Sequence, residues 1–161
     1  HFLNFLSNNS TTEYHFETYL YLTKINAELE QFEEALEYIK CAEKIHTNWE
    51  THFLTGIIYY HQGMYYHSVL ALEKALKLND TDKSVVEWTG KAYLKLGDFP
   101  NAHKYLSSFI ESAEPTAETY SYMGLACLNM QKLKEAGKYF ELALNLDPAN
   151  QAALDGIKKC T

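Results

Sequence analysis

The sequence predicts an all-α protein built from repeated helix–turn–helix units. The first observation is a glycine that recurs at a step of 34 residues, at Gly56, Gly90 and Gly124. The second is a large apolar column with the same step, formed by Leu72, Leu106 and Phe140. The third is the composition: 14% of the 161 residues are aromatic, too many for a disordered chain. No apolar stretch approaches the ~20 residues that a membrane-spanning helix needs.

A further column of small residues explains how two helices of one unit come together. It comprises Ser68, Ala102 and Ala136, again at a step of 34 residues. Small side chains and glycine let a second helix approach closely, although glycine costs about 1 kcal/mol in helix propensity. Gly63 and Gly97 suit the left-handed residue just beyond a helix end, and the last copy has Gln131 in that column.

The last copy carries the columns most fully. It contains Tyr120, Met123-Gly124, Ala136, Phe140, Ala143 and Pro148. In these positions the chain resembles the tetratricopeptide-repeat family, whose unit is a 34-residue helix–turn–helix. The resemblance implies a right-handed superhelical α-solenoid. It consists of three clear repeats, one irregular N-terminal repeat and a C-terminal capping helix.

The elements follow in order along the chain. Residues 1–13 are expected to be an N-terminal extension or the tail of a preceding helix, and Ser10-x-x-Glu13 could cap the start of the next helix. A single domain is expected over 14–160. Its repeats are placed at approximately 16–48, 49–82, 83–116 and 117–150, and its capping helix at 150–159.

In the family the first helices of the repeats line a concave groove, which usually binds a peptide or a helix of a partner. Projected onto this sequence, that geometry gives a groove with more apolar surface than a solvated face needs. Exposed aromatic residues of this kind are typical binding anchors. The candidate groove residues are Tyr21, Lys24, Phe53, Leu54, Ile57, Tyr60, Trp88, Lys91, Lys95, Tyr122 and Leu125. The lysines could receive an acidic group, or they could be solvated.

One subtype of the family binds the C-terminal carboxylate of heat-shock chaperones through a Lys/Asn/Asn/Lys/Arg clamp. The equivalent positions here are Leu20, Lys24, Leu54, Ser84 and Trp88, and none carries the required side chain. The sequence therefore disfavours that partner.

Charge, cysteines and missing motifs bound the remaining functions. The net charge is -7 and every basic residue is lysine, which argues against nucleic-acid binding. No nucleotide-binding loop, hydrolase motif, CxxC pair or pair of histidines at i, i+4 is present, so we expect no enzyme, no cofactor and no metal site. His103 is interpreted as a surface or partly buried residue, and Cys127 as a small core residue rather than a nucleophile. The three cysteines are expected to be free thiols in the cytoplasm.

These observations predict a protein–protein interaction scaffold that binds a peptide or helical segment in an apolar, aromatic-lined groove. Three alternatives stay open. The domain could be a chaperone-like holder of an apolar partner segment, a structural or oligomerising module, or an appendage that recruits substrate to an enzyme. The expected partner is a protein or peptide, with no nucleic acid and no membrane insertion, and the chain is expected to be a monomer or weak homo-oligomer.

Overall fold

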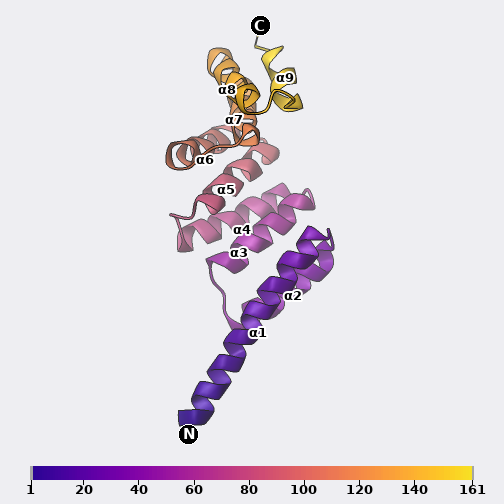
Figure 1. The fold of residues 1–161 in the computed structure, drawn as a ribbon, viewed down its shortest axis with the longest axis vertical. Coiled ribbons are helices and arrows are strands. Elements are labelled where there is room, and N and C mark those ends of the chain that lie inside the picture. Colours follow the sequence, from indigo (N-terminus) through magenta and orange to yellow (C-terminus); the bar gives the residue numbers. More distant parts are fainter. Residues whose placement is uncertain (1, 161) are drawn as a thin grey trace. The chain divides into compact units, whose positions relative to one another are not determined.

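The computed structural model describes residues 2–160, with side chains from Thr11 to Cys160, and Figure 1 shows the course of the chain. Within this range the chain forms nine α-helices and no β-strand. They are α1 (Phe2–Glu28), α2 (Phe32–Ile45), α3 (Trp49–His61), α4 (Tyr65–Leu78), α5 (Lys83–Leu96), α6 (Phe99–Ser112), α7 (Ala117–Asn129), α8 (Leu133–Leu146) and α9 (Gln151–Ile157).

The helices pack as sequential pairs. α1 packs with α2, α3 with α4, α5 with α6 and α7 with α8, while α9 packs against both α7 and α8. The all-α architecture of helix pairs with a closing helix is therefore confirmed. None of the helices in the described range is long and apolar enough to cross a membrane.

The helices of the chain fall into two compact units. The N-terminal unit runs to Asp80 and holds α1–α4, and the C-terminal unit starts at Thr81 and holds α5–α9. The structure places the expected N-terminal extension over 1–13 differently. Residues 2–13 are the first part of α1, so Ser10 and Glu13 lie inside a helix and cap no helix start. His1 lies outside the described residues.

The turns inside the four helix pairs share one backbone conformation. Gly63 and Gly97 have φ angles of 74° and 88°, the left-handed conformation that the sequence predicted for them. Glu30 and Gln131, at the matching places in the first and last pairs, have φ angles of 59° and 61°. Non-glycine residues rarely adopt this conformation, so the fold imposes this turn on all four pairs.

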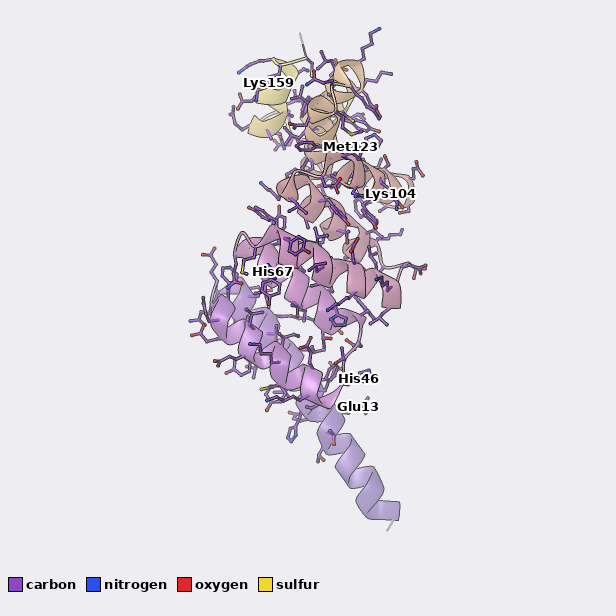
Figure 2. The ribbon with its side chains drawn as sticks, turned by 180° about the vertical axis from the view of Figure 1, so that it is seen from behind. Glu13, His46, His67, Lys104, Met123 and Lys159 are labelled. Atoms are coloured by element: carbon purple, nitrogen blue, oxygen red, sulfur yellow. The ribbon has the colours of Figure 1, made fainter. Side chains whose placement is uncertain are left out.

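The core of the C-terminal unit is organised around Phe140 of α8. Its ring is fully buried with Leu106, Met123 and Cys127, and Figure 2 labels Met123 among these helices. A Cβ atom placed on Gly124 of α7 would lie 2.5 Å from Phe140 Cε1. The glycine column thus leaves room for the large apolar column of the facing helix.

The N-terminal unit has a separate core of Phe16, Leu20, Ile39, Ala42 and Leu54, contributed by α1, α2 and α3. Its α3–α4 pair repeats the close approach: Ser68 Oγ donates a hydrogen bond of 2.7 Å to the Gly56 carbonyl. The shared core of Phe16, Leu20 and Leu54 places α1 and α3, the first helices of the two pairs, side by side.

Candidate peptide-binding surface

The predicted groove residues lie on the first helices of the helix pairs, which are α1 and α3 in the N-terminal unit and α5 and α7 in the C-terminal unit. The α1–α3 face of the N-terminal unit comprises Tyr21, Lys24, Phe53, Ile57 and Tyr60. The α5–α7 face of the C-terminal unit comprises Trp88, Lys91, Lys95, Tyr122 and Leu125. On each face the two helices pack directly against each other.

On the α1–α3 face, an ion pair joins the two helices. Lys24 Nζ lies 2.7 Å from Glu50 Oε1, so the ammonium already has an acidic partner. Tyr21 is 66% exposed, whereas Phe53, Ile57 and Tyr60 are half-buried. The face therefore offers apolar and aromatic surface around a pair whose net charge is zero.

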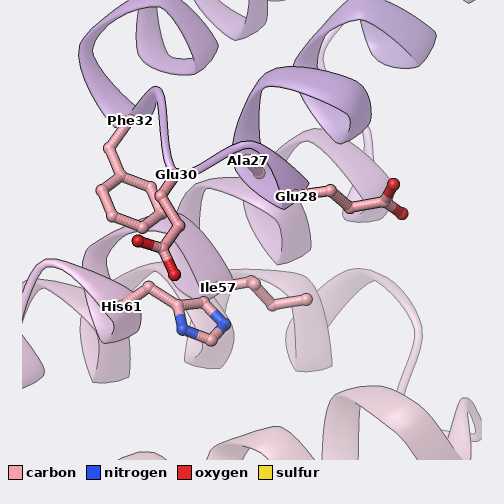
Figure 3. A pocket seen from close by; sticks show the side chains of 6 residues that line it. All are labelled: Ala27, Glu28, Glu30, Phe32, Ile57 and His61. Carbon is pink, nitrogen blue, oxygen red and sulfur yellow. The ribbon is translucent and has the colours of Figure 1, made fainter.

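Ile57 also lines a pocket of about 230 Å³ between the end of α1, the start of α2 and α3. Figure 3 shows Glu30 and Phe32 directed toward His61 at this pocket. The Phe32 and His61 rings stack with centroids 6.1 Å apart and an interplanar angle of 4°. A second open pocket, of about 350 Å³, lies between α1 and the end of α2, and two of its lining residues, Glu13 and His46, are labelled in Figure 2.

On the α5–α7 face, Lys91 is the centre of a compact network. Its Nζ lies 3.3 Å from Glu87 Oε1 and 3.1 Å from Glu118 Oε2. The ammonium also lies over the rings of Trp88 and Tyr122, 5.0 and 5.8 Å from their centroids. Such contacts between a cation and an aromatic ring are attractive. Lys91 is only 8% exposed, so its charge is satisfied within the protein.

Two hydroxyl groups complete this network. Thr119 Oγ1 donates a hydrogen bond of 2.8 Å to Glu87 Oε1, and the Tyr122 hydroxyl donates one of 2.9 Å to Glu118 Oε1. Burial raises the pKa of the Glu118 carboxyl, but the charge of Lys91 and the hydrogen bonds from Lys91 and Tyr122 outweigh it, so the pKa lies below its ordinary value. Trp88 and Tyr122 are thereby held in fixed positions on neighbouring helices.

The lowered pKa of Glu118 predicts a contribution to acid sensitivity. Its ionised form is stabilised by folding, so this contribution is complete above the ordinary pKa of 4.5 and is lost as the pH falls through the lower folded-state pKa. We expect Glu118→Gln to flatten the acid limb of a plot of unfolding free energy against pH. Glu114→Gln, at an exposed position before α7, is the control. An unchanged acid limb in Glu118→Gln would contradict the prediction.

The structure removes one residue from the candidate groove and gives two of its lysines partners within the protein. Leu54 was expected on the groove, but it is 7% exposed and packs in the core with Phe16, Leu20 and Ile39. It turns inward because α1 and α2 both pack on that side of α3. Lys24 and Lys91 were considered as receptors for an acidic ligand, yet both are paired with glutamates of the protein. Lys95 is exposed near the end of α5.

Sequence reasoning missed the acidic partners of these lysines. Glu87 stands four residues before Lys91, a spacing that brings side chains together on a helix. The Lys91–Glu87 pair could therefore have been predicted from the sequence. Glu118 and Thr119 come from the next first helix, and no local pattern indicated them. Cys127 is buried as predicted, and burial raises the pKa of its thiol to about 11, so without a metal ion the thiol is protonated at neutral pH.

Comparison with known proteins supports the repeat class. Residues 117–150 match the family model described as tetratricopeptide repeat. A solved fragment of MamA from Desulfovibrio magneticus RS-1 superposes with a TM-score of 0.80, covering 91% of this chain and 89% of that one at 22% identity, which shows the shared fold. Residues 117–150 thus match a tetratricopeptide repeat, and the chain as a whole has the fold of such repeats. Repeats of this class form protein-interaction scaffolds and are typically non-enzymatic.

Two further similarities are to proteins whose names mention heat-shock chaperones. The Hsp70-Hsp90 organizing protein of Triticum aestivum is 28% identical over 99 residues, which is 62% of this chain and 17% of that relative. The first such repeat domain of Spaghetti (RPAP3), solved bound to the HSP90 peptide SRMEEVD, superposes with a TM-score of 0.64 at 25% identity, covering 70% of this chain and 90% of that one. The chain therefore spans less than a fifth of the curated relatives that it matches. These similarities speak against our expectation that chaperone C-termini are a disfavoured partner.

Proposed function

We propose that this chain captures an apolar segment of a partner protein on the first-helix faces of its repeats. The observation that carries the proposal is the arrangement on the α5–α7 face. Trp88 and Tyr122 flank one ammonium group whose charge is already satisfied by Glu87 and Glu118. Two half-exposed rings on either side of a paired ammonium group suit apolar side chains of a ligand.

The α1–α3 face supports the same proposal for the N-terminal unit. Tyr21 is largely exposed beside the Lys24–Glu50 pair, and Ile57 borders the pocket at the end of α1. Both faces thus combine aromatic and aliphatic surface with one lysine, Lys24 or Lys91, that is paired with a glutamate of the protein. Charged residues such as Lys95 would then set the register and choice of the partner rather than supply most of the affinity. A reducing, cytoplasmic location is part of the proposal, and the three free cysteines suit it.

A peptide selected from a random displayed library against the folded chain tests this proposal. Trp88→Ala is expected to weaken binding of the selected peptide by about 2 kcal/mol, about 30-fold in Kd, because it removes a central aromatic anchor. Fluorescence anisotropy of the labelled peptide gives Kd, and circular dichroism checks the fold. Tyr66→Ala, at an exposed tyrosine of α4, is the matched control. Selected peptides that bind Trp88→Ala as tightly as the parent would contradict the proposal.

A second candidate function is recognition of a heat-shock chaperone C-terminus, favoured by the likeness to the RPAP3 domain bound to SRMEEVD. Leu20 and Leu54, at two of the five clamp positions, are buried apolar residues, so a carboxylate would need other donors. Lys95 is an exposed ammonium on the α5–α7 face. Labelled SRMEEVD and its C-terminally amidated form separate the two functions. Binding that is lost on amidation and weakened by Lys95→Ala supports this candidate, and equal binding of both forms contradicts it.

A further inference from the structure

Three side chains that are far apart in the sequence meet between α6, α7 and α8 of the C-terminal unit. They are His103 of α6, Cys127 of α7 and Glu135 of α8. One ring nitrogen, the Sγ atom and one carboxylate oxygen all lie within 4.8 Å of one another. Cys127 is fully buried in the core, whereas His103 and Glu135 are half-buried above it. None of the three side chains is among the candidate groove residues, although Cys127 is also part of the core around Phe140.

The three groups form a donor set that suits zinc. Zn²⁺ binds cysteine sulfur at about 2.3 Å, and histidine nitrogen and carboxylate oxygen at about 2.0–2.2 Å, in tetrahedral geometry. Such bond lengths place a nitrogen and an oxygen ligand about 3.3 Å apart, and a sulfur and a nitrogen ligand about 3.6 Å apart. His103 Nε2 and Glu135 Oε1 are already 3.2 Å apart. Cys127 Sγ lies within 4.8 Å of both atoms, and zinc binding would place it about 3.6 Å from the His103 nitrogen.

The surroundings keep the required atoms available. Lys132 Nζ lies 3.8 Å from Glu135 Oε2, the other carboxylate oxygen, so the oxygen nearest His103 is not the one that faces the lysine. The ligands come from three helices, and α7 and α8 are joined in the core by Gly124 and Phe140. Because His103 and Glu135 are partly exposed, water can reach the open side and serve as a fourth ligand.

We propose that His103, Cys127 and Glu135 bind one zinc ion that fastens α6, α7 and α8 together. A Zn–S bond replaces the S–H bond of Cys127, and the released proton passes to solvent, while neutral His103 and ionised Glu135 donate lone pairs. The ion would stabilise the folded C-terminal unit by mass action, since the unfolded chain does not hold the three ligands together. This site is independent of the proposed peptide-binding faces.

Cobalt and zinc titrations of the reduced, chelator-treated full chain without an affinity tag test the proposal. Co²⁺ is expected to give thiolate-to-cobalt charge-transfer absorption with the visible bands of tetrahedral cobalt, and Zn²⁺ should displace it. His103→Ala and Glu135→Gln should each weaken Zn²⁺ binding by at least about 10- to 100-fold, the loss seen even for groups outside the ligand shell. Zn²⁺ should raise the melting temperature of the parent chain and raise that of His103→Ala less.

The chain offers matched cysteine controls. Cys41→Ser and Cys160→Ser should keep the charge-transfer band, because both residues lie outside the cluster, whereas Cys127→Ser should lose it. His103 and Glu135 are partly exposed, so their variants test the site even if Cys127→Ser unfolds. Cobalt spectra without thiolate absorption would overturn the proposal. So would zinc affinity that is unchanged in folded His103→Ala, or a band that disappears with Cys41 or Cys160 instead.

Discussion

Replacing Phe140 by alanine is expected to lower the free energy of unfolding of the C-terminal unit by about 3–5 kcal/mol. The ring is fully buried and is the largest such side chain among the described residues. It fills the space left by Gly124 on one side and by Gly156 of α9 on the other. Neither glycine has a side chain that could move into the resulting cavity, so the site can collapse only by shifting whole helices.

Chemical denaturation followed by tryptophan fluorescence measures this loss. The two tryptophans lie in different units, Trp49 in the N-terminal and Trp88 in the C-terminal unit, so a Trp49→Phe background makes Trp88 the sole reporter. Leu142→Ala on the same helix is the control, because Leu142 is 41% exposed and its loss should cost little. Similar destabilisation by the two variants would show that the Phe140 ring is not the centre of this core.

Replacing Lys91 by alanine is expected to cost about 3 kcal/mol of stability, much more than an ordinary surface ion pair contributes. The change leaves the Glu87 carboxylate, whose side chain is 17% exposed, with the Thr119 hydroxyl but without its cation. An uncompensated, nearly buried charge is costly because it has lost most of its hydration. The rings of Trp88 and Tyr122 also lose the cation between them.

Lys24→Ala is the matched control for this prediction. Lys24 holds the equivalent place in α1 and pairs with Glu50 at 2.7 Å, but it is exposed, so its removal should cost less than about 1 kcal/mol. The double change Lys91→Met with Glu87→Gln should recover part of the loss, because it removes both charges together. Equal costs for Lys24→Ala and Lys91→Ala in urea denaturation would show that burial adds nothing to the Lys91 network.

The repeat columns made most of the fold predictable. A glycine in one helix and a bulky residue in the next recur at fixed positions. In closely packed helices the large side chain occupies the space that the missing side chain of the glycine leaves, as Gly124 and Phe140 show. Backbone conformation was predictable where glycine marked it, at Gly63 and Gly97. Glu30 and Gln131 adopt the same conformation without that signal, because the surrounding helix pair imposes it.

The candidate site was predictable in outline and less so in chemistry. Periodicity placed Trp88 and Tyr122 on neighbouring helices, and the structure brings both rings to one ammonium. The pairing of Lys91 with Glu118 depends on the distance between two helices, which a single sequence does not specify. The burial of Leu54 also depends on neighbouring helices: its place in the helical stripe predicted a surface residue, but α1 and α2 cover it. The His103–Cys127–Glu135 cluster joins three helices and has no local spacing at all.

Phe140 finally bears on where one module ends and the next begins. The match to the repeat family stops at residue 150, yet one side of the Phe140 ring is covered by Gly156, in the helix that follows. A protein cut after the last matched residue would expose that side of its own core to water. The repeat as it recurs in the sequence therefore ends before the segment that is needed to bury its core. A truncated or transplanted form of this protein should therefore keep α9 with the last helix pair.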